Sequence, residues 1–415
     1  MYLKFIIYSI LFVVIIDTYF FRSFSALIKN LKPNLRLALK LSYWAFTLAT
    51  IAFMFFVASY FQNKVAAPKI YRVYFMGFIM MNFMSKIIGC VFIIIHDLKT
   101  LGFFIKRKLF PVVEKRDKNT ISRKDFIKKA GVVAAAIPFG TLVFGMLKSA
   151  YDYTIKTEKL NIPNLPNAFK GLKIVQISDL HVGSFLDDEP LKKAIKIIND
   201  QQADVIFFTG DLVNDITEEA LPFMEVLSQI TAPMGVFSIL GNHDYGDYFY
   251  QREDLAGKKH NYELMKAVHQ KLGWKLLLNE HHIIEKDNER LAVIGVENWG
   301  SSERFPKLGD IEKAKNGLLT TDIKLLLSHD PSHWDAIVLP NHNDISATFS
   351  GHTHGMQFGI EIPHFKWSPS QYLYKQWAGL YNTNNQYLYV NRGLGFLGYP
   401  GRVGILPEIT VFELG

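Results

Sequence analysis

The residues best suited to chemistry in this 415-residue sequence are five short polar clusters between positions 179 and 354. They contain three kinds of metal ligand, namely carboxylates, imidazoles and a side-chain amide. In order along the chain the clusters are Asp179-Leu180-His181, Gly210-Asp211, Gly241-Asn242-His243-Asp244, Ser328-His329 and Gly351-His352-Thr353-His354. Carboxylates and imidazoles together suit Mn, Fe or Zn ions, whereas thiolate sites need cysteine, and the one cysteine lies at position 90. A carboxylate shared by two such ions would create a site that holds both the attacking and the leaving oxygen at phosphorus.

Each cluster follows a short apolar run that is typical of a buried β-strand. The runs are residues 172–178, 203–209, 235–240, 323–327 and 345–349. Short β-rich runs bounded by Gly or Asp favour strands buried on both faces, and open α/β sheets place their sites just past strand ends. Helical patterns at residues 190–200 and 218–229 alternate with the first three runs. The sequence therefore predicts an α/β domain with mixed sheets, in which five strand ends converge on one crevice.

At these clusters, over residues 170–415, the chain resembles the calcineurin-like metallophosphoesterases, whose pattern is D-x-H, G-D-x-x-D, G-N-H-D/E, a single H and G-H-x-H. The resemblance implies a four-layer αββα sandwich, in which two mixed sheets are flanked by helices, and two divalent metal ions as cofactors. It implies one metal held by Asp179, His181, Asp211 and His354, and a second held by Asp211, Asn242, His329 and His352, with Asp211 bridging.

The same resemblance gives His243 a catalytic role without making it a ligand, because it would contact the scissile phosphate and help the leaving oxygen depart. The chain departs from the family at the second Asp of G-D-x-x-D, which orients this histidine and is Asn214 here. Asp215 follows immediately and is a candidate for that role, although a shift of one residue re-aims the side chain. The implied reaction is hydrolysis of a phosphoester or pyrophosphate by hydroxide that the metal pair generates at neutral pH.

The first 150 residues have long apolar runs of a different kind. Residues 2–21, 41–61 and 73–95 each have the length of ~20 residues that crosses a bilayer. Residues 131–147 form a shorter, uncharged run, for which an interfacial or cleaved segment is the alternative to a span. We expect an all-α transmembrane module of about four helices at 1–150, followed by the metallophosphoesterase domain at 151–415.

Basic residues between the runs predict their orientation in the membrane. The first connection has five Lys or Arg and no acid, the second has three, and the third has eleven. The positive-inside rule places the first and third connections in the cytoplasm. The catalytic domain is then expected on the extracytoplasmic side of a bacterial inner membrane. Residues 122–128 also resemble a twin-arginine export signal, with Lys124 at the second Arg, or are simply the inside flank of a membrane helix.

The net charge of +8 is divided unevenly along the chain. Residues 1–150 have 22 Lys and Arg against 5 Asp and Glu, whereas the remainder has 24 against 33. The basic part can meet anionic lipid headgroups. The acidic remainder has no basic stripe, which argues against nucleic acid as a partner. A single cysteine excludes a disulfide framework, and the oligomeric state is left open.

Two charged residues, Asp17 and Lys86, interrupt the apolar runs. Ionisable residues within a membrane are costly, so we expect these two either to pair or to reach toward the inner interface.

An aromatic stretch at residues 365–402, interleaved with basic residues, suits a membrane interface or a pocket for a phosphate carrying an apolar group. The alternative is that many of its rings complete a sheet core, because residues 386–390 and 408–414 are typical of strands. Residues 351–357 and 402–410 resemble the membrane-anchored bacterial branch of the family, with Met356 where that branch usually has Gly. That branch includes pyrophosphatases acting on UDP-diacylglucosamine.

These features favour a membrane-embedded phosphohydrolase whose partners are the membrane and a phosphorylated lipid, envelope precursor or small molecule. One alternative is a phosphodiesterase or phosphomonoesterase for soluble nucleotides. Another is a non-enzymatic membrane sensor or scaffold with a relic domain, which the intact ligand set opposes. A transport role for the apolar runs is disfavoured because they contain few polar residues.

Overall fold

The computed structural model describes residues 2–62, 70–109 and 123–415. The chain divides into two compact units, Met1–Phe144 and Gly145–Gly415, and each is described by itself. Much of the second and third connections lies outside the described residues, as does the first residue of the twin-arginine-like segment.

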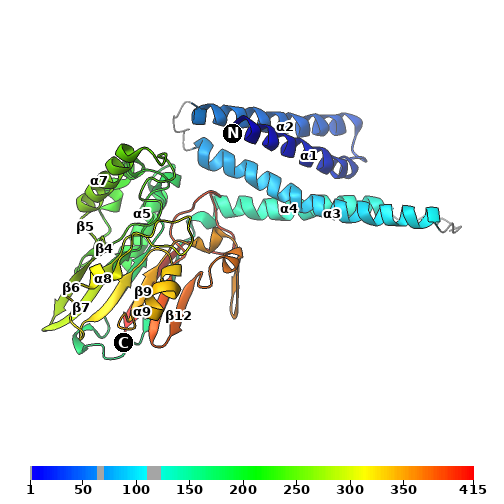
Figure 1. Ribbon diagram of the computed structural model, residues 1–415. Coiled ribbons are helices and arrows are strands. Elements are labelled where there is room, and N and C mark those ends of the chain that lie inside the picture. Colours follow the sequence, from blue (N-terminus) through cyan, green and yellow to red (C-terminus); the bar gives the residue numbers. More distant parts are fainter. Residues whose placement is uncertain (1, 63–69, 110–122) are drawn as a thin grey trace. The chain divides into compact units, whose positions relative to one another are not determined.

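The first unit is built from long apolar helices (Figure 1). They are α1 (Tyr2–Leu27), α2 (Pro33–Gln62), α3 (Met76–Leu109), which follows a wide turn at Ile70–Phe75, and α4 (Arg123–Leu147), whose last three residues belong to the second unit. Four described helical segments are long and apolar enough to cross a membrane, namely Ile7–Leu27, Pro33–Phe56, Val73–Lys106 and Ala130–Tyr151. The expectation of four apolar helices at the N-terminus is confirmed.

Asp17 and Lys86 form an ion pair in the first unit. The Lys86 ammonium donates to Asp17 Oδ1 at 2.6 Å, and the Thr47 hydroxyl donates to Asp17 Oδ2 at 2.5 Å. The Tyr43 hydroxyl also donates to Oδ1 at 3.2 Å. Of the two expectations for these charges, pairing is the one confirmed.

The second unit contains two six-stranded mixed sheets. The first sheet has the order β1 (Thr154–Leu160), β14 (Glu408–Leu414), β2 (Lys173–Ile177), β3 (Val205–Phe208), β4 (Val236–Ser238), β5 (Trp274–Leu276). The second has the order β12 (Gly379–Thr383), β13 (Gln386–Val390), β9 (Ala347–Ser350), β8 (Ile323–Leu327), β7 (Glu289–Gly295), β6 (Glu280–Lys286). Strands β2 to β5 are parallel, as are β13, β9, β8 and β7, whereas β14, β12 and β6 each pair antiparallel with a neighbour.

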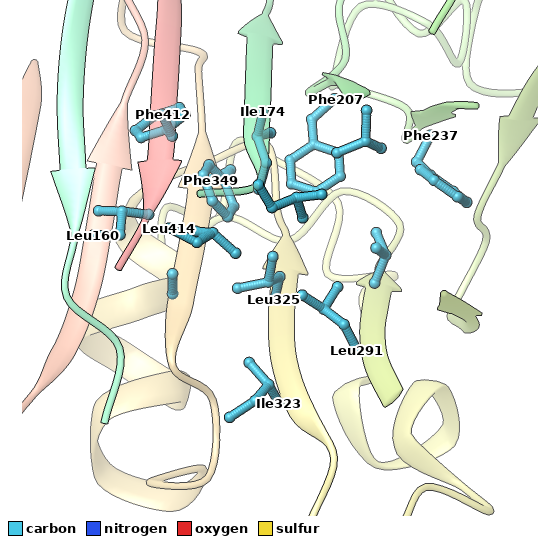
Figure 2. Packing of buried hydrophobic residues seen from close by; sticks show 14 of the residues in the cluster. Leu160, Ile174, Phe207, Phe237, Leu291, Ile323, Leu325, Phe349, Phe412 and Leu414 are labelled. Carbon is cyan, nitrogen blue, oxygen red and sulfur yellow. The ribbon is translucent and has the colours of Figure 1, made fainter. Parts of the chain in front are cut away.

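The two sheets pack face to face through one buried apolar cluster (Figure 2). Ile174, Phe207 and Phe237 come from the first sheet, and Leu325 and Phe349 from the second. Burying a side chain of this size is worth roughly 1.5–3 kcal/mol. This cluster therefore supplies much of the energy that fixes the two sheets, and with them the strand ends, in one arrangement.

Helices cover the outer faces and complete the predicted four layers. Helix α5 (Glu189–Asp200) lies along the first sheet with α7 (Leu255–Leu272), and α8 (Ile311–Lys315) packs on the second (Figure 1). Helix α5 buries Leu191, Ala194, Ile195 and Ile198, which share one face at helical spacing.

The helix expected at residues 218–229 is wrong in part. The chain there forms tight 3-10 turns at Thr217–Phe223 and only a short α6 (Met224–Leu227). Pro222 explains the difference, because proline lacks an N–H donor and disfavours α-helical geometry at the residue before it.

Candidate metal centre

The five polar clusters follow the carboxyl ends of parallel strands, as expected. Three of them follow β2, β3 and β4 of the first sheet, and two follow β8 and β9 of the second. The site therefore lies where the ends of two packed sheets meet, rather than at one edge of a single sheet.

One group of potential ligands consists of Asp179, His181 and His354. A ligand atom from each lies within 4.8 Å of the others, and all three side chains are buried. His354 Nε2 is 3.2 Å from Asp179 Oδ1, and the Nε2 atoms of His181 and His354 are 3.1 Å apart.

A second group consists of Asp211, His329 and His352, again with ligand atoms within 4.8 Å of one another. His329 Nε2 is 3.1 Å from Asp211 Oδ2 and 3.3 Å from His352 Nδ1. Asn242 adds its amide oxygen at 2.7 Å from His352 Nδ1. Asp211 Oδ2 also lies 3.6 Å from His181 Nε2, so this carboxylate stands between the two groups.

Backbone carbonyls determine which ring nitrogen of His181 and of His329 faces the centre. His181 Nδ1 lies 3.0 Å from the Val213 carbonyl oxygen, and His329 Nδ1 lies 2.7 Å from that of Thr209. A carbonyl only accepts, so both Nδ1 atoms must donate, and in a neutral ring each Nε2 then turns its lone pair toward the carboxylate of Asp211. Imidazole nitrogens and carboxylate oxygens that converge in this way could hold a cation between them, and this donor set fits divalent transition metals.

The electrostatics of the centre favour charged carboxylates and a neutral His181 ring. Burial lowers the pKa of His181 to about 3, so its ring is neutral. Burial also disfavours charge on His329, but the adjacent Asp211 carboxylate outweighs it and raises the pKa of His329 to about 10. Burial alone would raise the pKa of Asp211, yet the imidazoles of His329 and His243 hold it well below its ordinary value.

Asp244 clamps the loops that carry the ligands. Its carboxylate accepts hydrogen bonds from the backbone N–H groups of Gly241 and Asp211, both at 2.9 Å, and of Leu212 at 2.8 Å. Burial, together with the nearby charge of Asp211, raises the pKa of Asp244 to about 7. Asp244 ends the Gly241-Asn242-His243-Asp244 cluster, and the motif alone assigns it no role.

His243 lies beside both groups, and a backbone carbonyl orients it. Its Nδ1 donates to the Asn214 carbonyl oxygen at 2.5 Å, and its ring stacks on Tyr248 with centroids 4.2 Å apart. The Asn214 side chain points elsewhere and donates to Ser184 Oγ at 2.8 Å. Asn214, which stands where the family has the orienting Asp, thus orients His243 through its main chain, and the role of Asp215 stays a prediction.

A pocket of about 500 Å³ adjoins the second group. The Tyr374 hydroxyl lies 2.7 Å from His352 Nε2, and the Phe305 ring meets the His352 ring edge-on at 4.9 Å. Both residues line the pocket together with Arg304 and Lys375. Tyr374 and Lys375 belong to the predicted aromatic stretch. Phe305 and Arg304 were missed, because they lie in an irregular segment that matches no motif.

Comparison with known proteins identifies the family. Residues 172–356 match the family described as "Calcineurin-like phosphoesterase". Residues 3–150 match "Probable Calcineurin-like phosphoesterase, transmembrane domain". The chain belongs to the calcineurin-like metallophosphoesterases, a family of metal-dependent phosphoester hydrolases, and is a membrane protein.

Three relatives show how far this likeness extends. The chain is 30% identical over 305 residues to the uncharacterized metallophosphoesterase YkuE of Bacillus subtilis, covering 71% of this chain and 98% of that one. It is 29% identical over 286 residues to a transmembrane protein with metallophosphoesterase domain of Danio rerio, covering 67% and 61%. It is 28% identical over 284 residues to the UDP-2,3-diacylglucosamine pyrophosphatase LpxG of Chlamydia trachomatis, covering 56% and 81%.

Proposed function

We propose that this protein is a membrane-embedded two-metal phosphohydrolase that cleaves a phosphoester or pyrophosphate in a lipid or envelope precursor. The observation that carries the proposal is the pair of ligand groups that share the Asp211 carboxylate. The membrane helices of the same chain favour a lipid-linked substrate, as does the likeness to a pyrophosphatase named for a diacylated sugar nucleotide.

Seven residues would hold the two divalent ions, namely Asp179, His181, Asp211, Asn242, His329, His352 and His354. Such a pair supplies a hydroxide nucleophile at neutral pH and neutralises charge on the phosphoryl oxygens.

The side chains around the ligands have separate tasks in this proposal. His243, fixed by Asn214 and Tyr248, contacts the phosphate and assists the leaving oxygen. Tyr374 holds the His352 ring in place, while Arg304 and Lys375 offer positive charge to a second phosphate in the adjoining pocket.

The test uses the full-length protein in nanodiscs with Mn²⁺, assayed on bis-p-nitrophenyl phosphate, a nucleotide and a lipid pyrophosphate. We expect hydrolysis of the lipid pyrophosphate, and a loss of about 100- to 1000-fold in His243→Ala. His260→Ala is the matched control, because His260 is an exposed histidine that belongs to neither ligand group. Near-wild-type turnover of His243→Ala with both metals bound would refute its role. Activity on the nucleotide alone would favour a soluble substrate, and inactivity on every substrate with metals bound would favour the scaffold alternative.

The same proposal includes an extracytoplasmic position for the catalytic domain of a bacterial inner-membrane protein. An alkaline-phosphatase fusion after Gly415 tests it, because that reporter is active only after export. A silent fusion, together with an active cytoplasmic reporter at the same point, would reverse the orientation.

A further inference from the structure

A small β-hairpin follows the last predicted metal ligand and has two chemically different faces. Its strands are β10 (Ile360–Ile362) and β11 (Phe365–Trp367), and they pair antiparallel. Ile360 lies opposite Trp367 and Ile362 opposite Phe365. Because alternate side chains point to opposite faces, these four share one face, and the central pair Glu361–Lys366 occupies the other.

The polar face of the hairpin is turned toward the domain. Glu361 accepts from Arg392 at 2.8 Å and from Lys156 at 3.4 Å. The Lys366 ammonium donates to the Ala378 carbonyl and lies 4.8 Å from the centroid of the Trp377 ring. These contacts fix which face of the hairpin points inward.

The apolar face is consequently exposed, which is the reverse of the arrangement in a soluble hairpin. Ile360, Ile362 and Phe365 are 49%, 58% and 52% exposed. Other large apolar side chains that are exposed nearby along the chain are Met356, Phe358, Tyr372 and Leu373. Exposed apolar side chains gathered on one face of a hairpin mark an interaction surface.

The base of the hairpin is joined to the end of a membrane helix. The fourth candidate span runs Ala130–Tyr151, and its residues from Gly145 onward belong to the same compact unit as the hairpin. The Gly145 carbonyl accepts from the Arg402 N–H at 3.2 Å. The next residue, Val403, bridges to the hairpin base, because its carbonyl accepts from the Gly359 N–H at 2.8 Å.

Gly145 allows the end of the helix to approach residues 399–403 closely, because it has no side chain. A Cβ added there would lie 2.4 Å from the Tyr399 hydroxyl and 2.7 Å from the Arg402 carbonyl oxygen. Any larger residue would push the end of the helix away from the segment that holds the hairpin. The hairpin base is therefore only one short segment away from a residue of the span itself.

We propose that the hairpin β10–β11 inserts its apolar face into the interface of the bilayer that the chain spans. Amphipathic elements bind in this way, with apolar side chains buried roughly 5–10 Å into the boundary of headgroups and acyl chains. The continuity with the candidate span favours lipid over a second copy of the chain or an apolar peptide, because Gly145 lies within that span. The inference goes beyond the proposed function, because it holds whichever phosphate compound is cleaved.

This docking would hold the metal centre close to the lipid headgroups. The hairpin begins six residues after His354, and Gly355 between them is tied to the end of the hairpin by the Ser368 hydroxyl, which donates to its carbonyl at 2.7 Å. A phosphate attached to a lipid could then reach the centre without leaving the bilayer.

The experiment measures the depth of single labelled cysteines in the full-length protein. In a Cys90→Ala background, Ile362→Cys is compared with Asn288→Cys, which lies in the exposed turn between β6 and β7. Each is labelled with a fluorophore and placed in nanodiscs at one protein per disc. With lipids brominated near the carbonyl region, we expect the emission at Ile362 to fall about twofold and that at Asn288 to stay unchanged.

Two results would overturn the proposal. One is equal emission from the two sites with and without bromine. The other is shielding of the Ile362 label from a water-soluble quencher only when two copies share a disc, which would assign the face to a second copy.

A functional arm uses Phe365→Glu, with Asn288→Glu as the matched control. We expect Phe365→Glu to keep its rate on bis-p-nitrophenyl phosphate and to lose about tenfold on a lipid substrate in nanodiscs. An equal loss on both substrates would contradict a docking role. Failure of the proposed lipid chemistry is distinguishable from failure of docking, since the labelling result requires no activity.

Discussion

Replacing Asp211 with Asn tests whether one carboxylate serves both ligand groups. The change keeps the shape of the side chain and removes its charge. Asp211 Oδ2 lies 3.1 Å from His329 Nε2 and 3.6 Å from His181 Nε2, so both groups lose the same anion. Removing one electrostatic contributor typically costs about 100- to 1000-fold, or about 2.7–4 kcal/mol. Because both groups lose this anion at once, turnover should fall by about 1000-fold or more.

The assay combines metal analysis by mass spectrometry with initial rates on a soluble phosphodiester. Asp330→Asn is the matched control, because Asp330 Oδ2 lies 3.5 Å from His352 Nε2 and contributes to neither ligand group. An outer carboxylate of this kind is expected to cost only about 10- to 100-fold. An Asp211→Asn protein that still binds two ions and turns over within about tenfold of wild type would refute the bridging role.

Four further substitutions test the surroundings of the centre and the membrane unit. Asn214→Asp should leave turnover within about twofold of wild type, because the backbone carbonyl, not the side chain, accepts from His243; a larger change in the measured rate would show that the side chain matters. Asp244→Asn should weaken metal binding about 10- to 100-fold without removing a ligand, measured as a shift in the Mn²⁺ dependence of activity, and an unshifted curve would contradict the clamp. Asp17→Asn and Lys86→Met should each lower the free energy of unfolding by about 3–5 kcal/mol, and the double variant should lose less than the sum. Thermal unfolding in detergent measures this cycle, and simple additivity would argue against a coupled pair.

The strands could be predicted closely because their apolar runs are short and bounded by polar residues. Strand β8 was expected at 323–327 and β13 at 386–390, and both were found there. The segment after Thr217 was harder, since its apolar spacing favours a helix while Pro222 breaks it. Hydrophobic periodicity indicates which side chains are buried. It does not predict whether helical spacing or a helix-breaking proline determines the local backbone.

The identities of the candidate ligands could be proposed from the sequence, whereas their supporting contacts could not. Asp179 and His354 are far apart in the chain, and their 3.2 Å approach depends on how the two sheets pack. Tyr374 reaches His352 from a segment that lies 22 residues further along the chain. No spacing rule predicts such contacts, because they arise from tertiary structure rather than from a local motif.

The backbone of the centre adopts strained conformations that neighbouring loops hold in place. Asp179, His181, Asp211, His352 and His354 all have φ between 46° and 72°, in the left-handed region that costs non-glycine residues of order 1–3 kcal/mol each. Hydrogen bonds between the loops offset this strain. The Asp179 N–H donates to the Gly210 carbonyl, and the His181 N–H donates to the Asp211 carbonyl. The His352 N–H donates to the Asp179 carboxylate. Each loop is thus held by a neighbouring ligand loop, so a change in one should displace the others.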